Sequence, residues 1–212
     1  MASVVEQLFD DHGLVEKISR RLPHLFHYAE RDSSRAGKVG MEVGSLREKI
    51  LVSLLIHEFG RSNIETELPI TSHDVDVLIH RERLSIKSLT TKSIKIAGVK
   101  AIWTVDASQA KNFAEAFTPT SDYLIAHIFW GGKGGLYFVP LASQMEIFEG
   151  LGRQKYLKLP KPGTNPRGVE VSSNAMQHLI RQPAVRQIEI DWQRPEGDYD
   201  PYARWIEYWA LD

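Results

Sequence analysis

The chain has 212 residues, of which 42% are hydrophobic and 25% are charged, and this balance indicates one soluble globular domain. It contains no cysteine, which excludes disulfides, cysteine nucleophiles and thiolate zinc sites. It has neither the run of about eighteen apolar residues that a membrane span requires nor a signal-peptide start, so we expect a cytoplasmic protein without a membrane partner.

The formal net charge of −1 hides an uneven distribution. The last 24 residues hold seven acidic residues and two arginines, which leaves 24 bases and 20 acids, about +4, on the preceding part. A mildly basic body with an acidic tail can bind nucleic acid if its bases converge on one surface.

Residues 4–30 show helical spacing of apolar side chains and are predicted to form two helices separated at Pro23. The polar, glycine-containing stretch 31–40 follows and is expected to be a mobile loop. Its bases Arg35 and Lys38 could close on a DNA backbone, or the stretch could be a solvated linker.

A helix is predicted over residues 45–59. Ser45 and Glu48 have the spacing of a capping box, so Glu48 could simply cap the helix start. On a helical wheel, however, Glu48 falls at the centre of the apolar face, beside Val52 and Leu55. In this second interpretation the carboxylate of Glu48 points towards the core and towards the element that follows the helix in the chain.

That next element is a predicted β-hairpin with strands at residues 70–79 and 84–89 and a polar turn at 80–83. If the tip folds at Arg81–Glu82, position 76 lies opposite position 87. The period of two then gathers two carboxylates, a hydroxyl and an ammonium on one face, from Asp74, Asp76, Ser85 and Lys87. The other face is wholly apolar and should be buried, so the polar face either meets solvent or lines a site.

The following segments predict an α/β order. We expect a strand at 101–105, a helix from an Asp106 or Ser108 cap to Phe117, strands at 123–130 and 136–140, and a helix at 141–150, which together indicate a mixed sheet flanked by helices. Lys92 and Lys95, among serines and threonines, suit phosphate oxygens, although a solvated strand edge has the same composition. Lys133, in a glycine-rich hairpin turn, could reach a DNA groove.

The last sixty residues combine a basic loop, a polar helix and an aromatic tail. Arg167 belongs to a proline-, glycine- and base-rich loop and is a candidate phosphate contact. Residues 172–181 predict a capped helix whose Asn174, Gln177 and Arg181 share one face; such side chains can read base edges, but a plain surface helix has the same pattern. The aromatic tail should pack on the body or on a second subunit, with Trp192, Tyr199, Tyr202, Trp205, Tyr208 and Trp209.

Residues 44–105 resemble the core of the PD-(D/E)XK nuclease superfamily, in which an Asp and a (D/E)-X-K triplet hold a divalent metal beside a phosphodiester. Asp76, or Asp74 as the second choice, matches the motif Asp, and Ser85-Ile86-Lys87 matches the triplet with its Lys intact. Ser85 departs from the pattern, because a hydroxyl is a poor ligand for a hard cation. Glu48 is the candidate for the missing carboxylate, since many members of the family donate a helical Glu.

The resemblance implies a type II restriction endonuclease that acts as a homodimer on double-stranded DNA. Asp76 and Glu48 would hold Mg²⁺, Lys87 would act on the attacking water, and the products would carry 5′-phosphate and 3′-hydroxyl ends. The catalytic core would span about residues 44–140, and DNA-reading and dimer elements would lie in about 150–212. Two alternatives stay open: a repair or recombination nuclease that recognises DNA structure, and a non-catalytic DNA-binding relative.

Overall fold

The computed structural model describes residues 3–35, 38–39, 42–68, 74–161, 168–197 and 199–211, with the side chains of Arg35 and Lys38 left undescribed. Its centre is a six-stranded sheet in the order β11-β8-β7-β5-β4-β3. Strands β5 and β7 are parallel, and all other neighbours in this sheet are antiparallel. The predicted mixed sheet flanked by helices is therefore confirmed. The strands are β3 (Ile64–Glu65), β4 (Val77–Ile79), β5 (Glu82–Thr90), β7 (Asp122–Ile128), β8 (Lys133–Val139) and β11 (Arg186–Asp191).

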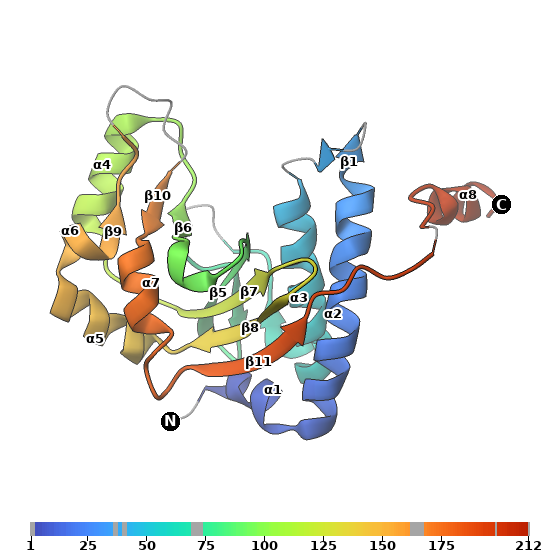
Figure 1. Ribbon diagram of the computed structural model, residues 1–212, viewed down its shortest axis with the longest axis horizontal. Coiled ribbons are helices and arrows are strands. Elements are labelled where there is room, and N and C mark those ends of the chain that lie inside the picture. Colours follow the sequence, from blue (N-terminus) through green and yellow to red (C-terminus); the bar gives the residue numbers. More distant parts are fainter. Residues whose placement is uncertain are drawn as a thin grey trace.

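Two layers cover the two faces of this sheet (Figure 1). One face packs on α1 (Gln7–Asp10), α2 (His12–Asp32) and α3 (Val43–Phe59). The other face packs on a smaller sheet of order β6-β10-β9 and on the helices around it. These elements are η3 (Ile94–Ile96), β6 (Val99–Ile102), α4 (Ala107–Ala116), α5 (Leu141–Leu151), α6 (Arg153–Tyr156), β9 (Leu157–Lys158), β10 (Val169–Val171) and α7 (Ser173–Leu179).

Strand β7 shows how the central sheet separates two hydrophobic cores, one on each face. Its residues are buried on both faces, and successive side chains of a strand point to opposite sides. Leu124 and Ala126 join the core under α2 and α3, whereas Tyr123 and Ile125 join the core under α5 and α7. The parallel neighbour β5 therefore also lies in the middle of the molecule, between the two layers.

The N-terminal helices differ from the prediction at Pro23. Helix α2 runs without a break through Pro23, because Leu22 and Phe26 on either side of it are buried in the same core. Burial outweighs the cost of a proline in a helix. The chain breaks earlier, at Asp11, whose carboxylate accepts a hydrogen bond from Leu14 N at 2.9 Å and caps α2.

The remaining short elements complete the chain. The predicted loop at 31–40 contains instead a pair of two-residue strands, β1 (Ser34–Arg35) and β2 (Lys38–Val39). Of the two candidate caps of α4, Asp106 is the one used, and the capped start predicted for α7 is confirmed at Ser172, since the side chain of each accepts hydrogen bonding from the first turn of its helix. Short 3₁₀ turns η1 (Val4–Glu6) and η2 (Arg61–Asn63) and the C-terminal helix α8 (Ala203–Trp209) complete the element order.

The central hairpin has a tighter turn than predicted. Strands β4 and β5 pair Val77 with Leu84 and Ile79 with Glu82, so the tip is His80–Arg81, both with positive φ (48° and 71°). The pairing is displaced by two residues from the prediction, which had set position 76 opposite position 87. A displacement of two keeps every side chain on its predicted face.

Within the described ranges, no helix has both the length and the apolar character that crossing a bilayer demands.

Candidate active site

The polar face of the hairpin converges on one carboxylate oxygen of Asp76. Its Oδ2 accepts hydrogen bonds from Ser85 Oγ at 3.0 Å, from the backbone N–H of Ile86 at 2.6 Å and from Lys87 Nζ at 3.2 Å. The backbone N–H of Asp76 also donates to Leu84 O at 3.0 Å and so continues the β4–β5 ladder. The structure thus brings Asp76, Ser85 and Lys87 together, as the alternation along the two strands predicted.

Three donors on Oδ2 fix the orientation of the Asp76 carboxylate. Ser85 is fully buried, while the side chains of Asp76 and Lys87 retain 22% and 16% exposure, so this group is open to solvent only on one side. Among the described residues, none donates to the other oxygen, Oδ1. Ser85 therefore acts here as a donor that orients Asp76, which is a task a hydroxyl performs well.

Helix α3 contributes Glu48 to the same place. A pocket of about 260 Å³ is lined by Glu48 from α3, by residues 86–88 of β5 and by residues 100–103 at the end of β6. Burial raises the pKa of Glu48, and the nearby negative charge of Asp76 raises it further, whereas Lys87 opposes the shift. The two carboxylates are thus close enough to repel each other.

The helix start excludes the capping interpretation of Glu48. Helix α3 begins at Val43, so Ser45 lies inside it, and no side chain caps this helix. The prediction that Glu48 lies at the centre of the apolar face is also wrong: Arg47, Leu51 and Leu55 are the buried residues of α3, and Glu48 lies half-buried at the edge of that face. This position at the edge lets its carboxylate reach the pocket.

Asp74, the second choice for the motif Asp, lies deeper than Asp76. It is 8% exposed, its Oδ1 accepts a hydrogen bond from the Tyr123 hydroxyl at 3.3 Å, and its backbone carbonyl accepts one from Ser121 Oγ at 2.7 Å. Burial raises its pKa to about 6, against the opposing charge of Lys87. Asp74 is therefore a buried neighbour of the site, and Asp76 is the better placed ligand.

The residues around the pocket fit a Mg²⁺ ion. Mg²⁺ typically keeps several waters and binds one or two protein carboxylates together with substrate phosphates. The described residues contain no cluster of three or more acidic, histidine or cysteine side chains, but Asp76 and Glu48 supply two carboxylates, with Oδ1 of Asp76 left for a cation. A cation there would also relieve the repulsion between the two carboxylates.

Sequence reasoning missed two residues that line this pocket. Lys100 lies 5.8 Å from the ring centroid of Trp103 and pairs with Glu170 at 2.7 Å, and Trp103 is 57% exposed. Neither residue was predicted to belong to the site. The end of β6 approaches β5 through the smaller sheet, and no local pattern indicates that contact.

The predicted DNA-contacting residues are distributed over several surfaces. Lys92 and Lys95 are exposed just beyond the end of β5. Lys133 begins β8 and pairs with Glu189 of β11 at 2.7 Å, so part of its charge is already balanced within the protein. The side chains of Arg35 and Lys38, and all of Arg167, lie outside the described residues.

The predicted reading helix α7 packs on η3 through one face and presents the other to solvent. Asn174 and Arg181 are exposed and Gln177 is half-buried, while Ala175, Met176 and Leu179 are buried. Asn174 lines a separate hollow of about 1230 Å³, away from the Glu48 pocket and rich in bases, lined among others by Lys111, Arg153, Lys155 and Lys158. The structure therefore does not bring Asn174 to the carboxylate site.

A mixed α/β core with Asp76 directly before one strand, S-X-K on the next strand and a helical Glu beside them is the arrangement that the resemblance to PD-(D/E)XK restriction endonucleases implies. Comparison with known proteins agrees. The sequence model of the restriction endonuclease ThaI family matches residues 8–211, and the chain belongs to this family.

A solved structure described as a restriction endonuclease in complex with substrate DNA is 47% identical to the chain. The similarity covers 98% of this chain and 99% of that chain, with a TM-score of 0.90. Among curated proteins, no sequence matches the chain significantly.

Proposed function

We propose that this restriction endonuclease is a Mg²⁺-dependent type II enzyme that hydrolyses both strands of double-stranded DNA at a short symmetric site. The observation that carries the proposal is the Asp76 carboxylate, which is oriented by three donors, Lys87 among them, and lies close enough to Glu48 to raise the pKa of that residue. A non-catalytic relative would have no need to hold two half-buried carboxylates and an ammonium together.

Asp76 and Glu48 would hold the metal, and Ser85 and the N–H of Ile86 keep Asp76 in place. The bound ion would supply positive charge that polarises the phosphoryl group and stabilises the leaving oxygen. Lys87 lines the pocket and contacts Asp76, so it would orient the attacking water, help to remove its proton and offset phosphate charge.

The products follow from an in-line displacement at phosphorus. The oxygen of water forms the new bond, the bond to the 3′ oxygen breaks, and the proton of the attacking water is released as the 3′ oxygen is protonated. The ends are then 5′-phosphate and 3′-hydroxyl. We place this chemistry in a core of about residues 44–140, and we assign DNA reading and dimer contacts to elements of about 150–212. The cytoplasm stays our predicted location.

We also propose that the enzyme is a homodimer, because the described part of each chain offers one such site and a symmetric duplex needs two. Helix α8 supports this, since it projects from the body at the end of an extended segment (Figure 1). Tyr199 stacks on Tyr28 at 4.4 Å, and Arg204 pairs with Asp32 at 3.2 Å, so the tail is anchored to α2. After Tyr199, six large apolar side chains of the tail are exposed: Tyr202, Trp205, Ile206, Tyr208, Trp209 and Leu211.

Sedimentation velocity tests the role of this tail. The double variant Trp205→Ser and Ile206→Ser should sediment as a monomer, while Leu159→Ser, which removes an exposed apolar side chain elsewhere, should sediment as the wild type does. A dimer of unchanged affinity in the tail variant would assign the interface to another surface.

The decisive experiment for the activity is incubation of a mixed-sequence plasmid with the protein and Mg²⁺. Discrete bands that disappear with EDTA and with Asp76→Asn are expected, and Lys49→Ala, on the exposed side of α3, should cut normally. Cleavage only at junctions or mismatches would favour a structure-specific nuclease, and binding without cleavage would favour a non-catalytic relative.

A further inference from the structure

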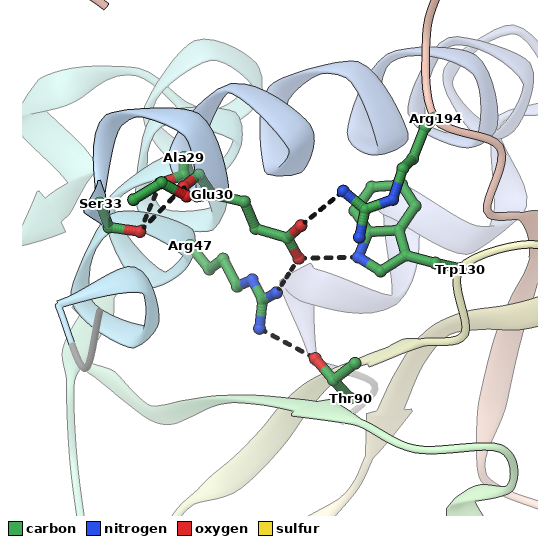
Figure 2. A network of polar contacts seen from close by, with 8 residues as sticks. Ala29, Glu30, Ser33, Arg47, Thr90, Trp130 and Arg194 are labelled. Atoms are coloured by element: carbon green, nitrogen blue, oxygen red, sulfur yellow. Dashed lines mark hydrogen bonds and ion pairs between the residues drawn. The ribbon is translucent and has the colours of Figure 1, made fainter. Parts of the chain in front are cut away.

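A buried ionic network centred on Glu30 joins α2, α3 and the central sheet (Figure 2). The Oε1 atom of Glu30 accepts hydrogen bonds from Arg47 Nη2 at 2.5 Å and from Trp130 Nε1 at 2.7 Å. Its Oε2 lies 3.2 Å from Arg194 Nη1, and the Arg194 guanidinium lies 4.7 Å from the Trp130 ring centroid. The side chains of Glu30 and Arg47 are only 6% and 7% exposed.

Arg47 connects three elements through its planar guanidinium. One nitrogen bonds Glu30 of α2, and the other, Nη1, donates to Thr90 Oγ1 at 3.1 Å, at the last residue of β5. The guanidinium also lies 5.7 Å from the ring centroid of Phe26 in α2. The fork geometry of arginine lets one side chain satisfy both polar partners at once, which lysine cannot do.

The network joins the two elements that carry the candidate active site, helix α3 and strand β5. Arg47 immediately precedes Glu48 in the second turn of α3, so a rotation of α3 that moved Arg47 would also move Glu48. Thr90 is three residues beyond Lys87 on β5, the strand whose donors orient Asp76. The bond from Arg47 to Thr90 thus ties the helix that carries Glu48 to the strand that carries Lys87.

A buried charge pair is an unusual choice for stability alone. Desolvation of the two charges offsets much of their attraction, and apolar replacements of similar volume often stabilise a protein as well or better. A hydrogen-bonded ion pair, in contrast, allows one relative position of the elements it joins, whereas apolar contacts tolerate sliding. The cost of burying Glu30 and Arg47 is therefore better explained by the geometry that they enforce.

We propose that the Glu30–Arg47–Thr90 network is a positioning device that sets the Glu48 carboxylate against Asp76 and Lys87. Arg47 and Glu30 are positioning residues, since they act through α3 and β5 and line no part of the pocket. The inference rests on the proposed role of Glu48 as a metal-binding carboxylate.

Thr90→Val tests the device with little risk to folding, because Thr90 lies at the exposed end of β5 and valine keeps its shape. Metal binding is measured with Mn²⁺ by electron paramagnetic resonance on the full chain, and kcat and KM are measured on plasmid DNA with Mg²⁺. Loss of an outer contact of a metal ligand typically reduces metal affinity or activity by about 10- to 100-fold. We expect a reduction towards the lower end in Mn²⁺ affinity and in kcat, with KM for DNA unchanged.

Three further variants make the result specific. Thr90→Ser retains the hydroxyl and should restore Mn²⁺ affinity and kcat, and Thr120→Val, at another exposed threonine, should behave as the wild type. Arg47→Lys keeps the charge beside Glu30 but loses the hydrogen bond to Thr90 Oγ1. Its Mn²⁺ affinity and kcat should therefore fall as those of Thr90→Val do.

Glu48→Gln separates the two proposals. If Glu48→Gln lowers Mn²⁺ affinity while Thr90→Val and Arg47→Lys leave both Mn²⁺ affinity and kcat unchanged, the positioning role is wrong and the site assignment stands. If Glu48→Gln itself changes neither quantity, the role of Glu48 fails, and the positioning role fails with it.

Discussion

Asp74 should destabilise the folded protein at neutral pH. Its carboxyl is buried, and among the described residues its Oδ2 has no hydrogen-bond partner. Burial raises its pKa from 3.8 to about 6 in the folded state. Because the folded state then binds this proton more tightly than the unfolded chain, the contribution of Asp74 to stability is most favourable below pH 4, falls as the pH rises from about 4 to about 6, and stays low above that.

The substitution Asp74→Asn removes this titration and keeps the shape and the acceptor for the Tyr123 hydroxyl. A difference of two pKa units corresponds to about 3 kcal/mol. We therefore expect Asp74→Asn to be more stable than the wild type at pH 8 by up to about 3 kcal/mol, or roughly 5 to 10 °C in Tm for a protein of this size. At pH 4 the two proteins should melt together.

Thermal melting between pH 4 and pH 8, with EDTA present to exclude metal binding, measures this difference. The matched control is Asp191→Asn at an exposed site on β11, which should leave Tm nearly constant relative to the wild type. Equal melting of wild type and Asp74→Asn at pH 8, or a variant that is less stable there, would refute the reasoning that burial holds this carboxyl in an unfavourable charged state.

Three further predictions address the site and the DNA contacts. Lys87→Ala should abolish cleavage while DNA binding in Ca²⁺ stays close to wild type in a gel-shift assay, and near-normal cleavage would reject this hairpin as the site. Glu48→Gln should remove cleavage with little change in Tm, because α3 begins at Val43 and Glu48 caps nothing; a wild-type rate would place the missing ligand elsewhere. Gln177→Ala should weaken binding to the cognate duplex by about 1 to 3 kcal/mol and spare a scrambled one, whereas Lys95→Ala should weaken both and flatten the salt dependence. Equal weakening on both duplexes by Gln177→Ala would show that α7 only positions the protein.

Local patterns in the sequence determined the two faces of the central hairpin. Asp76, Ser85 and Lys87 share a face because side chains alternate along each strand, and this holds for any pairing displaced by an even number of residues. The predicted turn was one residue too far along the chain, which displaced the pairing by two residues, and the faces were still right. The caps at Asp106 and Ser172 are equally local, since each involves only the residues of one helical turn.

Tertiary structure alone decided the turn, the course of α2 and the environment of Glu48. His80 and Arg81 adopt positive φ without a glycine to signal it, and α2 continues through Pro23 because both flanks are buried in one core. The helical wheel placed Glu48 at the centre of the apolar face, whereas the buried face of α3 also includes the charged residue Arg47.

Arg47 is buried instead, since Glu30 and Thr90 satisfy it from elements distant in the sequence. A buried charge is stable only beside its partners, and partners brought together by packing leave no periodic trace in the sequence. The edge position of Glu48, and the pocket it shares with Lys87, follow from that packing.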